Sequence, residues 1–181
     1  MSTVAARTPF ETLQRLEWLG EQHRAELPAQ EDARHTWSGI GFRIGGRRFV
    51  APMGEVTEIL TIPQVSRVPR AKSWVWGVAN VRGNLLPIMD LSQYLGKGGV
   101  NATRLTRVMV IEQGSVAAGL LVDEVLGMRH FFSEERSQAP AQEDDSVQPY
   151  VDGVFRRDGS DWTIFSMAAL AGHPQFLKVA E

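Results

Sequence analysis

Residues 77–91, GVANVRGNLLPIMDL, form the stretch around which the fold is predicted. Apolar residues on both sides of Arg82-Gly83-Asn84 indicate two short strands joined by a tight turn. Glycine and asparagine accept the positive φ angles of a two-residue hairpin turn, so Gly83 and Asn84 are predicted to form it. Arg82 then lies at the tip of an apolar hairpin. There it is either solvated, as most turn arginines are, or in contact with a carboxylate of a partner.

Length and composition limit the class of protein. The chain has 181 residues, of which 43% are hydrophobic, which predicts one domain or two small ones sharing a core. It has no cysteine, which excludes disulfides and thiolate metal sites. A net charge of -2 gives no general attraction to nucleic acid. No apolar run is long enough to span a membrane and residues 1–30 lack a signal pattern, so we expect a cytoplasmic protein without direct membrane insertion.

Residues 1–34 are predicted to be a helical N-terminal extension followed by a linker. Thr8, Pro9 and Glu11 match a capping box with proline at the first helical position. Leucines and Phe10 recur on one face at helical spacing. This face either packs back on the following domain or docks on another protein.

The domain itself is predicted to span residues 35–181, because the hydrophobic pattern changes from helical spacing to alternation at Trp37. About ten short strands with frequent turns follow, which is typical of small barrels or a sandwich. The glycine-rich residues 96–103 are interpreted as a hinge between two halves, and short helices are expected at about 167–180. The acidic residues 133–148 are predicted to form a mobile loop.

One strand carries an acid in an unexpected place. Glu58 shares a strand side with the apolar residues Val56 and Leu60. It is therefore either a charge that protects an edge strand from aggregation or a contact residue on a mixed apolar and acidic surface.

We find no arrangement of residues that predicts catalysis, a metal site or a cofactor. The four histidines are scattered and pair with no carboxylate at metal-ligand spacing. Asp90, Asp123 and Glu124 fall at strand ends, where acids usually accept hydrogen bonds from turn amides. The basic segment around Arg67 and Arg70 lacks the interleaved aromatic residues of a nucleic-acid platform.

Three separated segments resemble the signatures of CheW-like domains: residues 77–91, GLLVDEVLGM at 119–128 and YVDGVFRRDG at 150–159. The resemblance covers about residues 37–171. It implies a mainly β, CheW-like fold of two five-stranded SH3-like β-barrels around a shared apolar core. The subdomains are then expected at about 37–95 and 105–165.

The resemblance also implies a function. CheW-like domains have no enzymatic activity and bridge the cytoplasmic tip of a methyl-accepting chemoreceptor to the CheW-like regulatory domain of a CheA-type histidine kinase. Carried over by position, the receptor-side residues are Val56, Glu58, Gly77 and Arg82. No motif assigns the kinase-side residues.

Within the family, residues 37–56, the ending FLKVA and the N-terminal extension most resemble adaptors of type IV pilus (twitching motility) systems. An adaptor of a flagellar chemotaxis array or of another two-component array is an alternative, as is a barrel that binds an oligonucleotide or small ligand. The sequence departs from the family pattern at Trp74 and Trp76, which are bulkier than usual, and at Ser166, which replaces an acid.

Overall fold

The computed structural model describes residue 10 and residues 36–137, 144–157 and 159–180. The chain divides into two compact units, Met1–Arg34 and His35–Glu181. The predicted N-terminal helix with its capping box lies outside the described residues except for Phe10. The strands and helices that the structure describes in full all belong to the second unit.

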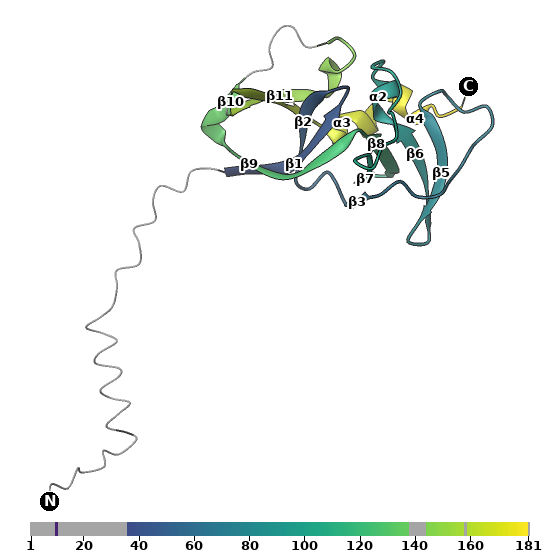
Figure 1. The fold of residues 1–181 in the computed structure, drawn as a ribbon, viewed down its shortest axis with the longest axis horizontal. Helices are drawn as coiled ribbons and strands as arrows, with labels where there is room; N and C mark the ends of the chain where they lie inside the picture. Colours follow the sequence, from purple (N-terminus) through teal and green to yellow (C-terminus); the bar gives the residue numbers. More distant parts are fainter. Residues whose placement is uncertain (1–9, 11–35, 138–143, 158, 181) are drawn as a thin grey trace, which may run out of the picture. The chain divides into compact units, whose positions relative to one another are not determined.

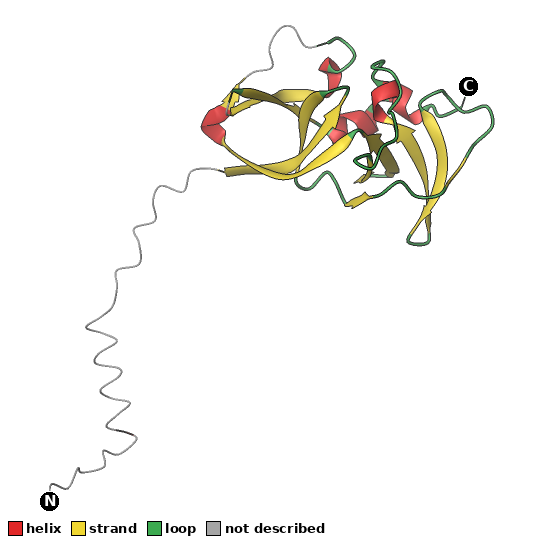
Figure 2. Ribbon diagram, in the orientation of Figure 1, coloured by secondary structure: helices red, strands yellow, loops and turns green. Residues whose placement is uncertain are grey.

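This unit consists mainly of β-strands, with short helices between and after them (Figure 2), which confirms the predicted mainly β class. The strands are β1 (Thr36–Ile44), β2 (Arg47–Pro52), β3 (Glu58–Leu60), β4 (Val65–Ser66), β5 (Val75–Val81), β6 (Asn84–Asp90), β7 (Arg107–Gln113), β8 (Val116–Val122), β9 (Glu124–Phe132), β10 (Arg136–Ser137), β11 (Val151–Arg157) and β12 (Ser160–Phe165). The α-helices are α2 (Leu91–Tyr94), α3 (Met167–Gly172) and α4 (Pro174–Leu177), and the 3₁₀ helices are η1 (Ser133–Glu135) and η2 (Gln148–Tyr150).

The described strands form two six-stranded sheets (Figure 1). Sheet 1 has the order β10-β11-β12-β2-β1-β9, and sheet 2 has the order β3-β7-β8-β6-β5-β4. The expected subdomains at 37–95 and 105–165 need correction, because each sheet takes strands from both halves of the chain. The β1–β2 hairpin pairs with β9 and β12, whereas β3 leaves that sheet and pairs with β7. The sheets exceed the expected five strands because each gains a two-residue strand at its edge, β10 or β4.

The largest apolar cluster is shared by the two sheets and the C-terminal helices. Its members include Phe42 of β1, Leu120 of β8 and Phe176 of α4, all fully buried. A second cluster, which includes Phe131 and Trp162, lies on the other face of sheet 1. Because side chains alternate along a strand, β1 can supply both clusters. Each fully buried phenylalanine stabilises the fold by roughly 1.5–3 kcal/mol, so the shared cluster holds the two sheets together.

The hairpin at 77–91 is present, but its turn lies one residue earlier than predicted. Val81 pairs with Asn84, and the turn residues Arg82 and Gly83 have φ angles of 51° and 89°. Asn84 therefore begins β6. The side chain of Asn80 accepts a hydrogen bond from the Gly83 amide at 2.8 Å, which helps to hold this left-handed turn.

The two tryptophans that depart from the family pattern have different surroundings. Trp74 precedes β5, and its ring packs edge-on against Tyr94 with a centroid distance of 5.4 Å. Trp76 lies within β5 and packs against a separate apolar cluster of sheet 2 that includes Ile88 and Leu121. A β-bulge lies between Val75 and Gly77. These contacts allow both bulky side chains to be partly buried without sharing one pocket.

The acidic segment 133–148 contains η1, β10 and the start of η2, and residues 138–143 lie outside the described residues. After α4, the chain returns to sheet 2: the Lys72 amide donates to the Val179 carbonyl at 2.9 Å, and Ala71 bridges to Ala180. The C-terminal segment thus attaches to the loop between β4 and β5. Among the described residues, no helix is long and apolar enough to cross a membrane.

Candidate partner-binding surface

The tip of the β5–β6 hairpin is tied to strand β3 by an ion pair. The Arg82 guanidinium lies 2.6 Å from the Glu58 carboxylate. The arginine side chain is 78% exposed and the glutamate 22% exposed. The unexpected acid of β3 and the turn cation are therefore one structural unit, in which the cation faces outward.

The other two receptor-side residues inferred from the sequence have different environments. Val56 is partly buried against the shared apolar cluster. Gly77 is buried in β5 with φ of 147°, and a Cβ there would lie 2.3 Å from the Ser66 carbonyl oxygen. Gly77 therefore allows β4 to approach β5 closely. The structure thus brings Glu58 and Arg82 into contact, while Val56 and Gly77 make separate packing contacts.

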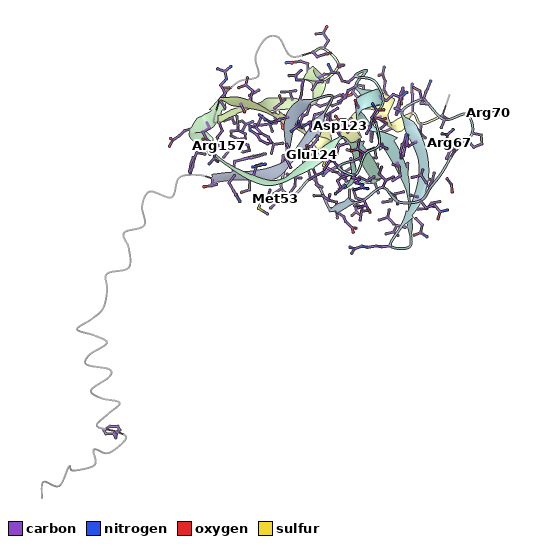
Figure 3. The ribbon with its side chains drawn as sticks, in the orientation of Figure 1. Met53, Arg67, Arg70, Asp123, Glu124 and Arg157 are labelled. Atoms are coloured by element: carbon purple, nitrogen blue, oxygen red, sulfur yellow. The ribbon has the colours of Figure 1, made fainter. Side chains whose placement is uncertain are left out.

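Apolar side chains and arginines are exposed beside this hairpin. Leu85, near the start of β6, is 73% exposed. It lines a shallow cavity of about 620 Å³ together with Val68, Val78 and Arg67. Arg67 and Arg70 come from the loop between β4 and β5 and are labelled in Figure 3. This edge of sheet 2 therefore offers apolar contact area bordered by positive charge.

The loop that carries Val56 is fastened to the C-terminal helices. The carboxylate of Glu55 accepts hydrogen bonds from the amides of Met167, at 2.5 Å, and Ala168, at 3.3 Å. Ser166 caps the same helix, α3, by accepting from the Ala169 amide. Free amides at a helix start favour a nearby carboxylate. Glu55 thus supplies a negative charge beside the position where Ser166 replaces the acid typical of the family.

The acids considered as catalytic candidates make structural contacts instead. Asp90 is buried at the start of α2 and accepts from the amides of Gln93, at 2.9 Å, and Val100, at 2.8 Å. Asp123 accepts from the Gly45 amide at 2.7 Å, and Glu124 lies 3.5 Å from Arg43. Figure 3 labels Asp123 and Glu124. Among the described residues, no three acidic or histidine side chains lie together in a way that could hold a metal ion.

A cluster of hydroxyl and imidazole groups joins α2, η2 and the start of α4, and the sequence pattern does not reveal it. The Tyr94 hydroxyl lies 2.8 Å from the Tyr150 hydroxyl and 3.1 Å from Nδ1 of His173. Burial raises the pKa of Tyr94, and the hydrogen bond with Tyr150 raises it further. Burial also raises the pKa of Tyr150, against an opposing effect of the same hydrogen bond. The cluster therefore favours neutral tyrosines.

Comparisons with known proteins place the chain in a family. The family model described as CheW-like domain matches residues 38–175. Protein PilI of Pseudomonas aeruginosa is 49% identical over 174 residues, which cover 96% of this chain and 97% of PilI. Protein FrzA of Myxococcus xanthus is 32% identical over 68% of this chain and 76% of its own length.

A solved structure shows the same fold. The scaffolding protein TtCheW from Thermoanaerobacter tengcongensis superposes with a TM-score of 0.64 at 20% identity, over 71% of this chain and 88% of that one. This confirms the predicted CheW-like fold. Together with the family model and the extended similarity to PilI, it shows that the chain belongs to the CheW-like domain family.

Proposed function

We propose that this protein is a non-enzymatic adaptor that couples a methyl-accepting chemoreceptor to a CheA-type histidine kinase in a type IV pilus (twitching motility) system. The observation that carries the proposal is the 49% identity to PilI over nearly the whole of both chains. That similarity favours the pilus system over the flagellar alternative, because the N-terminal extension lies within the aligned length. The proposed location is the cytoplasmic face of receptor arrays, reached through the two partners.

The receptor is proposed to contact the hairpin tip, strand β3 and the loop before it, through Arg82, Glu58 and Val56, with Gly77 shaping the surface beneath. A guanidinium has five N–H donors, so an exposed Arg82 bound to Glu58 keeps donors available for a partner carboxylate. An amphipathic receptor helix would place its apolar side chains against exposed ones such as Leu85, with the charged pair setting register.

The proposed mechanism requires no bond to be made or broken. Two surfaces on one rigid body bring receptor and kinase to a high effective concentration. The shared apolar cluster supports this rigidity because it fixes both sheets against each other. A signal would then pass as a change in the geometry or affinity of an interface.

The proposal is tested by receptor pull-down with Arg82→Glu. An exposed ion pair contributes about 0–1 kcal/mol, so this variant should remain folded while losing receptor binding. The double variant Glu58→Arg/Arg82→Glu restores an internal pair with reversed charges. If Arg82 contacts the receptor, the double variant should still fail to bind; recovery of binding would show that only the internal pair matters.

Arg104→Glu serves as the control, since it introduces the same charge change at an exposed position before β7. It should bind receptor like the unmodified protein. Copurification with the kinase should persist in all three variants. Unchanged receptor binding by folded Arg82→Glu would refute the site, and absence of any kinase or receptor binding by the unmodified protein would refute the function.

A further inference from the structure

Two arginines from different strands lie over one tryptophan ring on sheet 1. The guanidinium carbon of Arg129, on β9, is 5.2 Å from the centroid of Trp162, on β12, and that of Arg48, on β2, is 5.8 Å from it. The ring itself is buried, whereas both arginines are exposed. A tryptophan face attracts cations, so it holds both positive charges at the surface.

Neither arginine has an acidic partner among the described residues. Arg48 donates to the Ser160 hydroxyl at 2.6 Å, and neither Arg48 nor Arg129 forms an ion pair with any residue the structure describes. Like charges held near one ring repel each other, and a bound anion would relieve that repulsion. The arrangement is therefore complementary to negative charge from outside the domain.

A glycine on the intervening strand makes this arrangement possible. A Cβ at Gly41 of β1 would lie 2.9 Å from the Trp162 ring and 3.0 Å from Cγ of Arg129. A side chain there would displace the ring or the arginine. The need for glycine at position 41 is therefore steric, since this residue lies in a strand and not in a turn.

The surroundings indicate the shape of the ligand. Met128, 52% exposed, lines a shallow cavity of about 330 Å³ with Arg129, Arg157 and Trp162. β9 is the terminal strand of sheet 1 and has β1 as its neighbour in that sheet. A terminal strand can accept a further strand through its backbone groups. On β9 the His130 carbonyl already accepts a hydrogen bond from Arg157 and the Phe132 amide donates to Glu135, so an added strand would pair with the stretch before His130. An extended chain with alternating acidic and apolar side chains would match both the arginines and Met128.

We propose that the β9 edge of sheet 1, with Arg48 and Arg129, binds an extended acidic segment of a partner protein. This surface lies on sheet 1, whereas Glu58 and Arg82 lie on sheet 2. The proposal goes beyond the receptor site, and the two can fail independently, because each is tested with its own variants.

The test uses the full chain and an eight-residue capped peptide that alternates glutamate and valine, with a glutamine–valine peptide for comparison. Nε1–H resonances of the five tryptophans are followed by NMR, and Trp162→Phe assigns one of them. The glutamate peptide should shift the Trp162 signal, and added salt should weaken the effect. Arg48→Gln/Arg129→Gln should weaken binding by about tenfold or more.

Arg104→Gln removes the same charge outside this surface and should leave peptide affinity unchanged. Arg129→Lys keeps the charge and should retain more binding than Arg129→Gln. The proposal is overturned if the glutamate peptide does not shift Trp162. It is also overturned if the glutamine peptide binds with the same affinity as the glutamate peptide. The same holds if Arg104→Gln loses as much affinity as Arg48→Gln/Arg129→Gln.

Discussion

Asp90 is the last residue of β6, and its carboxylate should stabilise the chain where it leaves the β5–β6 hairpin. It is buried and binds two amides, those of Gln93 in α2 and Val100 in the following loop. Asp90→Asn keeps one acceptor oxygen for the Gln93 amide. It places an NH₂ group, which is not an acceptor, opposite the Val100 amide. Loss of a charge-assisted hydrogen bond with a buried donor left unpaired costs about 1.5–3 kcal/mol.

Asp90→Ala removes the bond to Val100 and also the bond to Gln93, which is the N-cap hydrogen bond of α2, and loss of this cap adds about 1 kcal/mol. We expect urea midpoints, followed by circular dichroism, to decrease in the order unmodified protein, Asp90→Asn, Asp90→Ala. With an m-value of about 2 kcal/mol/M, the asparagine variant should unfold at a urea concentration about 1 M lower.

The control for this series is Asp152→Asn, which makes the same chemical change at an exposed position in β11. Its stability should change by less than about 0.5 kcal/mol. If Asp90→Asn is as stable as Asp152→Asn, the carboxylate does not organise this region and our account of it is wrong.

Three further outcomes are expected. Gly77→Ala should lower the free energy of unfolding by about 2 kcal/mol or more, because its Cβ would lie 2.3 Å from the Ser66 carbonyl oxygen. The measurement is chemical denaturation, and an unchanged midpoint would contradict this close approach. Glu55→Gln should lower the thermal midpoint and cost about 1–2 kcal/mol, since a charged acceptor is lost at the start of α3; equal stability would show that the charge is unimportant there. Because burial raises the pKa of Tyr94 in the folded state, stability should fall as pH rises above the unfolded value of about 10; this fall should be smaller in Tyr94→Phe, and equal pH profiles would contradict the assignment.

The local features of the fold were predictable because they are written in short-range patterns. Alternation predicted the strands, and Arg82-Gly83-Asn84 predicted a tight turn. The position of the turn was wrong by one residue, since both Gly83 and Asn84 tolerate positive φ. The structure places that conformation at Arg82 and Gly83 instead. The pairing of Val81 with Asn84 sets the register of the hairpin. Turn propensities of single residues do not predict which residues pair.

Long-range features could not be read from the sequence. Glu55 and Met167 are separated by 112 positions, so their hydrogen bond leaves no local pattern. Arg48, Arg129 and Trp162 come from three strands whose contact depends on the order of sheet 1. Two residues of the candidate site could be singled out from the sequence, Glu58 as an acid in an apolar setting and Arg82 as a cation at the tip of an apolar hairpin. Their ion pair with each other was not predicted, because it depends on how β3 lies beside that hairpin.

The interleaved topology has a consequence for an adaptor. The β1–β2 hairpin lies in sheet 1, the next six strands, β3 to β8, lie in sheet 2, and the chain then returns to sheet 1. The chain therefore crosses between the two sheets twice, after β2 and after β8. The shared cluster fills the space between the sheets. A relative movement of the sheets would expose fully buried side chains such as Phe42 and Leu120, at roughly 1.5–3 kcal/mol each. The partner surfaces proposed on the two sheets would thus be held in fixed relative positions, so a change in one bound partner would reach the other through geometry alone.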